Sequence, residues 1–189
     1  MVLIASTRPG RVGPAVANWF FEAAKKHGKF DVELVDLASF ALPVFDEPNH
    51  PAQQKYQHEH TKKWAATVSR FDAYTLVTPE YNFGPTPALT NALNYLYHEW
   101  SYKPAGFVSY GGISGGMRGV QAAKQLVTTL KMMPMYEGVP IPGVAALLAD
   151  EGGTKVFRAN EHHEKGAVAL LEETLKWSTA LRTIRKPVA

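Results

Sequence analysis

Short apolar runs alternate along the chain with longer segments in which apolar residues recur at helical spacing. The runs predict strands at 1–5, 30–37, 73–78 and 104–110, and a fifth strand, broken by glycines and prolines, at 136–148. Helical spacing predicts helices at 12–27, 53–70, 87–100, 118–133 and 162–184.

Strict alternation of strands and helices is typical of a parallel sheet covered by helices on both faces. The crossovers between parallel strands are expected to be right-handed. The proline-rich stretch at 43–51 reads as a surface loop, and no internal repeat is visible. We therefore expect residues 1–189 to form a single α/β domain.

Composition narrows the class of protein. Of 189 residues, 46% are hydrophobic and 20% charged, which is ordinary for a globular protein. The net charge of +3 is small, and the lysines and arginines are scattered along the sequence, so a nucleic-acid partner has little support. The absence of cysteine excludes disulfides, thiolate nucleophiles and cysteine-ligated metals. Without a long apolar run or a signal-peptide pattern, we expect a cytoplasmic protein with no membrane partner.

The candidate chemistry lies in three loops, each of which follows a predicted strand. Open parallel sheets bind ligands at the carboxyl ends of their strands. The first loop, 6–13, places Ser6, Arg8, Arg11 and Gly13 just before a helix N-terminus, where free N–H groups favour an anion such as a phosphate. Alternatively, Ser6 caps a turn and the two arginines are solvated.

The second loop, 78–87, is stiffened by three prolines and carries Tyr81 and Phe83, which could line a flat heterocycle. Alternatively, the two aromatic rings simply pack against the protein. The third loop, 109–116, is rich in glycine, which lets the backbone approach a ligand closely or only shapes a tight turn. It matches neither a Walker A loop nor the dinucleotide-binding fingerprint.

Together, the three loops resemble the NADPH-dependent FMN reductase family of flavodoxin-like proteins, which includes quinone, azo-dye and chromate reductases. The resemblance covers nearly the whole chain in order and spacing, and its most specific part is the Pro-Glu-Tyr-Asn segment. The matching residues are Ser6-Thr7-Arg8, Pro79-Glu80-Tyr81-Asn82, Pro87-x-Leu89-x-Asn91-Ala92 and Ser109-Tyr110-Gly111-Gly112. Arg11 and Gly84 stand where many members have serine.

The resemblance implies a three-layer fold with strand order 2-1-3-4-5, FMN as cofactor and NADPH or NADH as co-substrate. It also implies a homodimer or homotetramer with the helix near 89–100 at the interface. The FMN phosphate would be held by Ser6, Arg8, Arg11, Val12 and Gly13. The isoalloxazine would be flanked by Pro79, Glu80, Tyr81, Asn82 and Phe83, and closed at its other edge by Ser109, Tyr110, Gly111 and Gly112.

In such an enzyme the flavin carries the redox chemistry, and the protein binds and orients it. We expect hydride transfer from nicotinamide C4 to flavin N5, followed by ping-pong reduction of a small acceptor such as a flavin or quinone. No side chain is required as a catalytic residue. Arg8, Arg11 and Arg118 are candidate contacts for the phosphates of the nicotinamide cofactor, although for Arg118 a solvated arginine in the first turn of a helix is the favoured interpretation, because charged side chains are mostly exposed.

Three other interpretations remain open. Gly112-Ile113-Ser114-Gly115-Gly116 fits the Gly-x-Ser-x-Gly turn of a serine hydrolase, with Asp150 and His162 or His163 following in the right order. A flavin-binding electron carrier that is not an enzyme is the second, although such carriers are usually acidic. A metal site is the third, but His58 and His60, two apart on a predicted helix, should point to different faces, and no complete ligand spacing is present.

Overall fold

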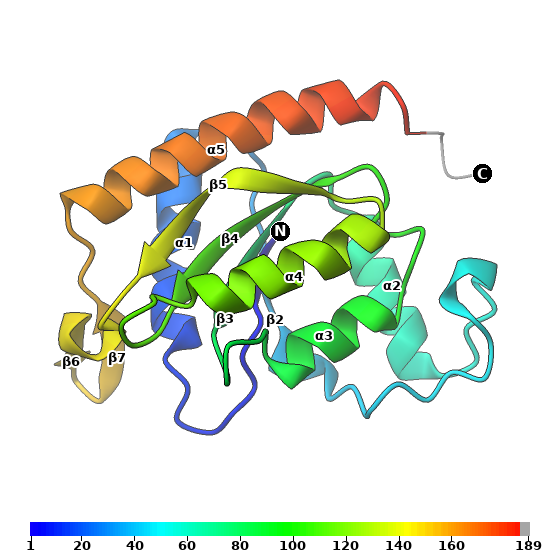
Figure 1. Ribbon diagram of the computed structural model, residues 1–189, viewed down its shortest axis with the longest axis horizontal. Coiled ribbons are helices and arrows are strands. Elements are labelled where there is room, and N and C mark those ends of the chain that lie inside the picture. Colours follow the sequence, from blue (N-terminus) through cyan, green and yellow to red (C-terminus); the bar gives the residue numbers. More distant parts are fainter. Residues whose placement is uncertain (186–189) are drawn as a thin grey trace.

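The computed structural model describes residues 1–185, in which five parallel strands form one sheet in the order β2-β1-β3-β4-β5 (Figure 1). The strands are β1 (Val2–Ile4), β2 (Leu34–Asp36), β3 (Tyr74–Pro79), β4 (Pro104–Tyr110) and β5 (Met133–Ile141). The chain extends the sheet from β1 to β2, then returns past β1 and continues to β5. The predicted fold class and strand order are confirmed, and the direction of strand addition reverses between β1 and β3.

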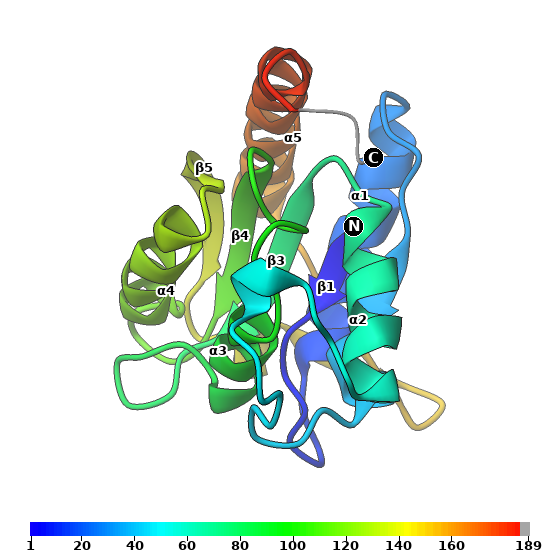
Figure 2. The same ribbon diagram turned by 90° about the vertical axis from the view of Figure 1, so that its right-hand side faces the viewer.

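Helices cover both faces of this sheet (Figure 2). One face carries α1 (Gly13–His27) and α5 (Glu161–Arg182), and the other carries α2 (Glu59–Ser69), α3 (Pro87–Asn94) and α4 (Met117–Thr129). Each face has its own cluster of buried apolar side chains. The five helices thus form the outer two layers of a three-layer arrangement, as predicted.

The packing of the strands explains why their sequences are continuous apolar runs. Leu3 and Leu76 pack into the cluster beneath α2, α3 and α4, whereas Val2 and Val77 pack into the cluster beneath α1 and α5. Successive side chains point to opposite faces of a sheet, so a strand covered on both faces must be apolar at every position. Burying each such side chain stabilises the fold by about 1.5–3 kcal/mol.

Two predicted helices are shorter than their apolar spacing indicates. The helix predicted at 87–100 ends at Asn94, because the buried Glu99 carboxylate accepts the Tyr97 N–H in place of a helical carbonyl. The helix predicted at 53–70 begins only at Glu59, after a 3₁₀ turn (Pro51–Gln53) that ends with Gln54 in the left-handed region.

The region around the fifth strand differs most from prediction. Strand β5 starts three residues earlier than predicted, because Lys131 takes a positive φ of 59° and ends the preceding helical segment. As the edge strand it tolerates prolines. A hairpin that was not predicted, formed by β6 (Leu148–Glu151) and β7 (Thr154–Phe157), follows a 3₁₀ turn (Val144–Leu147). Another short 3₁₀ turn (Leu37–Phe40) follows β2.

Within residues 1–185, the helices are all too short or too polar to cross a lipid bilayer.

Candidate functional site

The three loops singled out in the sequence lie side by side at one edge of the sheet. Strands β1, β3 and β4 are neighbours and run parallel, so their carboxyl ends meet at the same edge (Figure 1). Register pairs Ile4 with Val77 and Pro79 with Tyr110. The loop from β1 to α1 (5–12), the loop from β3 to α3 (80–86) and the loop from β4 to α4 (111–116) are therefore close enough to share a ligand.

The loop from β1 to α1 is built on a tight contact among three residues. Ser6 is fully buried, and its Oγ accepts a hydrogen bond of 3.2 Å from the Tyr110 hydroxyl. Burial raises the pKa of Tyr110 to about 12, so its hydroxyl stays a donor at neutral pH. A Cβ atom on Gly13 would lie 2.2 Å from Ser6 Oγ and 2.8 Å from Tyr110 Oη. Only glycine lets α1 start this close to the strand ends.

The N-terminus of α1 is open toward this loop. Its N-cap residue, Val12, has no side chain that could accept a hydrogen bond. Within residues 1–185, the backbone amides of Val12 and Gly13 donate no hydrogen bond. The following residue is Pro14, which has no N–H. Two free donors at the positive end of a helix dipole form an anion-binding position.

The two arginines of this loop have different surroundings. Arg11 pairs with Asp36 at the end of β2, with Nη1 to Oδ1 at 2.7 Å, and also donates to the Ser6 carbonyl. Arg8 is exposed, and its guanidinium carbon lies 5.9 Å from the centre of the Tyr81 ring. Arg8 thus reaches toward the neighbouring loop, whereas Arg11 is used to fix its own loop to β2.

The loop from β3 to α3 folds into a tight turn at its tip. Tyr81 and Gly84 exchange backbone hydrogen bonds of 3.0 and 2.9 Å, and Asn82 and Phe83 between them take positive φ values of 48° and 70°. The Phe83 ring is 65% exposed, and the Arg118 guanidinium carbon lies 3.8 Å from its centre. Left-handed conformation is costly for a phenylalanine, and such strain often marks functional loops.

In the loop from β4 to α4, the glycine backbone packs closely against the backbone of neighbouring segments. Ser109 Oγ donates to the Gly115 carbonyl at 2.8 Å. Gly115 and Gly116 have positive φ values of 58° and 83°, and a Cβ on either would come within 3.0 Å of neighbouring backbone. Gly112 differs, because a Cβ there would meet no atom within 4 Å. The glycines therefore both shape the turn and leave one open position on it.

Glu80 joins the second and third loops. One carboxylate oxygen accepts from Ser114 Oγ at 2.9 Å and from the backbone amide of Arg118 at 3.0 Å, and the other accepts from Arg118 Nε at 2.7 Å. The hydrogen bond from Arg118 holds the pKa of Glu80 below its usual value. Glu80 was predicted for the ring site, but this network was not predicted, and Arg118 is exposed in the first turn of α4 as one interpretation expected, while also pairing with Glu80. No sequence signal linked these two residues.

The serine-hydrolase arrangement is not formed. Ser114 Oγ donates to Glu80, and in residues 1–185 it has no hydrogen bond with a histidine. His163 instead closes a capping box with Asn160 at the start of α5, its Nδ1 accepting the Asn160 amide at 3.2 Å. The Asp150 carboxylate accepts a hydrogen bond from Gly153 within the hairpin.

The prediction that His58 and His60 point apart is also wrong. Helix α2 begins at Glu59, so His58 lies outside it as the N-cap residue. The two rings stack with centres 5.1 Å apart, and His60 Nε2 lies 3.0 Å from the Asp46 carboxylate. Even so, within residues 1–185 no three histidine, aspartate or glutamate side chains are grouped to hold a metal ion.

The fold and the three loops define the class of flavodoxin-like proteins. A flavoenzyme NAD(P)H:(acceptor) oxidoreductase from Paracoccus denitrificans matches with a TM-score of 0.65 at 19% identity, covering 96% of both chains. The Megasphaera elsdenii flavodoxin matches with a TM-score of 0.53 at 18% identity, covering 90% of this chain and 98% of its own. At these identities the likeness concerns the fold.

Sequence comparison gives the family. Residues 1–145 match the NADPH-dependent FMN reductase family, and the chain belongs to it. An NAD(P)H-dependent FMN reductase of Schizosaccharomyces pombe is 43% identical over 118 residues, 61% of this chain and 59% of that protein. Another from Nectria is 35% identical over 164 residues, 84% of this chain and 78% of its own. A Pseudomonas putida quinone reductase is 30% identical over 80% of this chain and 81% of its own.

The match to the Schizosaccharomyces pombe protein thus spans less than two thirds of that relative's length. The predicted family is confirmed, and with it the oxidoreductase class and the family's use of FMN and NAD(P)H. The serine-hydrolase interpretation finds no support among the relatives.

Proposed function

We propose that this protein binds FMN across the three loops, reduces it with NADPH or NADH, and passes the electrons to a flavin, a quinone or another small acceptor. The observation that carries the proposal is the open N-terminus of α1, where the amides of Val12 and Gly13 have no acceptor within residues 1–185. Such donors suit the FMN phosphate, and family membership supplies the flavin.

The residues around this position fit a phosphate. Ser6 is fully buried and its Oγ accepts from Tyr110, so Ser6 would support the loop from beneath rather than meet the ligand. Arg8 is exposed beside the same loop and can add a charge-assisted hydrogen bond. Arg11 would contribute by holding the loop against Asp36, because its guanidinium is already paired there. We therefore assign Arg8, Val12 and Gly13 to the phosphate, with Ser6 and Arg11 in supporting positions.

The second and third loops suit the two edges of a flat ring. The turn at Asn82 and Phe83 is fixed by two backbone hydrogen bonds, and Pro79 and Tyr81 precede it on the same stiff segment. On the other side, the open space above Gly112 lets a ring approach the backbone of Gly111 and Gly112. We propose that Pro79–Phe83 flank the isoalloxazine and that Ser109, Tyr110, Gly111 and Gly112 close its other edge.

When bound, FMN supplies the two-electron chemistry, accepting hydride from NAD(P)H at N5 and passing the electrons on. For a quinone, the overall reaction converts NAD(P)H, a proton and the quinone into NAD(P)⁺ and the hydroquinone. We propose ping-pong kinetics, in which the oxidised nucleotide leaves before the acceptor enters. The chain's own residues bind and orient, and none is assigned a step in bond making.

A visible spectrum tests this function. Purified protein incubated with excess FMN and then desalted should stay yellow, and anaerobic NADPH or NADH should bleach it. Adding a quinone should restore the colour. Protein that is colourless after desalting would contradict the proposal, whereas yellow protein that neither nucleotide bleaches would favour an electron carrier. We further propose that residues 1–189 form one domain; the cytoplasmic location and the homodimer or homotetramer stay predictions.

A further inference from the structure

The Glu80 carboxylate accepts hydrogen bonds from several groups of the protein, which a residue that only lined the flavin ring would not need. Its side chain is only 7% exposed, although it lies between Pro79, the last residue of β3, and Tyr81 in a loop. Besides the bonds from Ser114 and Arg118, its Oε2 accepts the amide of Gly119 at 3.3 Å. The carboxylate is therefore committed to the protein and meets the neighbouring loop rather than the open space between the loops.

These bonds give α4 the cap that its own sequence lacks. The N-cap residue of α4 is Gly116, which has no side chain, and the amides of Arg118 and Gly119 in the first turn donate to Glu80 instead. A carboxylate at a helix N-terminus is favoured by the helix dipole and by the free amides. A residue of the second loop thus caps the N-terminus of the helix that follows the third loop.

Arg118 extends the same contact to the tip of the second loop. Its guanidinium donates to Glu80 and lies over the ring of Phe83. Behind it, a Cβ on Gly119 would come within 2.7 Å of the Gly84 carbonyl, so the first turn of α4 packs directly on the turn at 81–84. Helix and turn are held on both sides of the Glu80 carboxylate.

We propose that Glu80 is a positioning residue that fixes the two ring-binding loops relative to each other, and that Glu80 and Arg118 balance each other's charge beside the flavin. The inference rests on the proposed function, because it assigns the loops to the flavin ring. Glu80 acts through the backbone of the two loops and through its charge, with no contact to a reacting atom.

The charges give opposite expectations for two variants. Reduction adds negative charge to a flavin, so nearby charge shifts its midpoint potential. Glu80→Gln leaves the Arg118 charge unbalanced and should raise the potential. Arg118→Leu leaves the Glu80 charge unbalanced and should lower it. A purely structural role would not give shifts of opposite sign.

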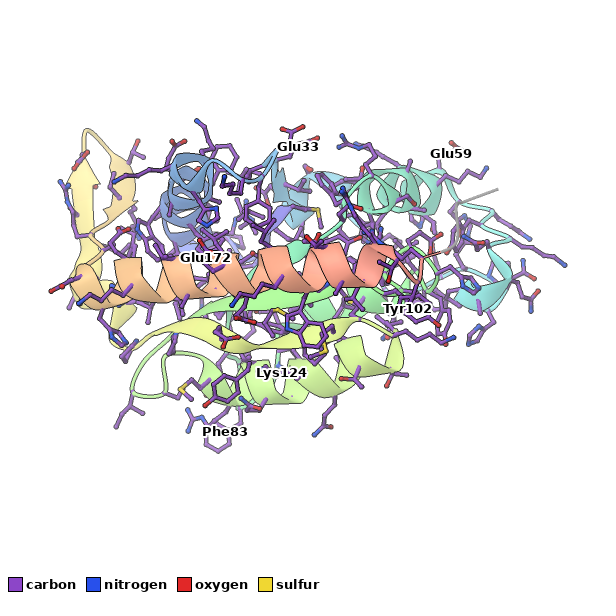
Figure 3. The ribbon with its side chains drawn as sticks, turned by 90° about the horizontal axis from the view of Figure 1, so that it is seen from above. Glu33, Glu59, Phe83, Tyr102, Lys124 and Glu172 are labelled. Carbon is purple, nitrogen blue, oxygen red and sulfur yellow. The ribbon has the colours of Figure 1, made fainter. Side chains whose placement is uncertain are left out.

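Affinity gives a second readout. Glu80→Gln should weaken FMN binding about tenfold, the loss expected when a charge-assisted hydrogen bond is removed. The matched control is Glu33→Gln, because Glu33 forms a comparable two-bond pair with Arg70, at 2.8 and 2.9 Å. Figure 3 shows Glu33 and Phe83 on opposite sides of the molecule. The control should keep the wild-type affinity and potential.

FMN affinity is measured by quenching of flavin fluorescence, the potential by dye-coupled anaerobic titration, and folding by circular dichroism. Both variants are measured, because only a pair of opposite shifts separates the effect of charge from a structural effect, and a shift against its expected sign in either variant already contradicts the inference. The inference would be overturned if the two potentials stay unchanged or move in the same direction, or if Glu80→Gln binds FMN as tightly as the control. These outcomes count against the inference alone as long as the wild type still binds FMN and is bleached by NADPH. A wild type that takes up no FMN would overturn the proposed function and this inference with it.

Discussion

Two glycine-to-alanine substitutions separate the packing of the first loop from the space offered to the ring. In Gly13→Ala, the new methyl group would lie 2.2 Å from Ser6 Oγ, where ordinary contacts start near 3.4 Å. Ser6 is fully buried, so its hydroxyl must turn away from Tyr110 or α1 must shift. Losing the hydrogen bond costs about 1 kcal/mol and overpacking about 1–3 kcal/mol, so unfolding should become easier by about 2–4 kcal/mol.

Gly112→Ala should behave differently. Its methyl group would meet no protein atom within 4 Å, and Gly112 is not among the glycines with a positive φ. The free energy of unfolding should therefore stay within about 0.5 kcal/mol of the wild type. FMN binding should nevertheless weaken by roughly 5- to 150-fold, because a methyl group placed against a bound ring costs about 1–3 kcal/mol.

Urea unfolding of the apoprotein and quenching of FMN fluorescence measure the two effects separately. Gly13→Ala should lose both stability and affinity, and Gly112→Ala only affinity. A Gly13→Ala protein as stable as the wild type would refute the tight contact at Ser6. A Gly112→Ala protein with unchanged affinity would refute the placement of the ring beside the third loop.

Three further changes follow from single contacts. Burial raises the pKa of Asp36, but the hydrogen bond from Arg11 outweighs it, so the net pKa is lowered. The Arg11–Asp36 pair therefore stabilises the protein above the ordinary aspartate pKa of about 4, and this stabilisation is lost as the pH falls through the lowered pKa. Urea unfolding should therefore show Asp36→Asn about 1 kcal/mol less stable at pH 7, with a difference that shrinks as the pH falls below the ordinary pKa of about 4; a pH-independent difference would contradict this. Tyr110→Phe removes the donor to Ser6 and should cost about 1 kcal/mol in thermal unfolding and weaken FMN severalfold, whereas unchanged values would show that the bond is unimportant. Gly166 lies inside α5, and the nearest contact of an added methyl group would be an ordinary one at 3.4 Å. Gly166→Ala should therefore raise the free energy of unfolding by about 0.5–1 kcal/mol without changing FMN affinity. A loss of stability would mean that the helix cannot accommodate the methyl group.

Much of the fold could be predicted because strand and helix periodicities differ clearly along the chain. The strand at 104–110 was predicted with the observed bounds, since it is mostly apolar and ends at a glycine pair. The helix at 87–100 was overextended, because Trp100 reaches the core from a turn and thereby keeps helical spacing without a helix. The hairpin at 148–157 was missed, although its Gly152-Gly153 turn is a recognisable hairpin signal.

The position of the site could be predicted, but its internal pairing could not. Loops after parallel strands meet at one edge of a sheet whatever their sequence, so local motifs were enough to find them. The partners of Arg11 and Arg118 depend on which residues of distant segments face them. Asp36 lies 25 residues from Arg11, and Glu80 lies 38 residues from Arg118. Only the strand order and register bring these carboxylates to the arginines.

The central claim is that one FMN molecule is held at once by the N-terminus of α1 and by the third loop. Backbone amide NMR of the apoprotein titrated with FMN tests it most directly, with inorganic phosphate as the comparison. We predict that the amides of Val12, Gly13 and Gly112 shift together and saturate at one FMN per chain, and that phosphate shifts only Val12 and Gly13. Amides of the first loop that stay in place while FMN binds elsewhere would contradict the account.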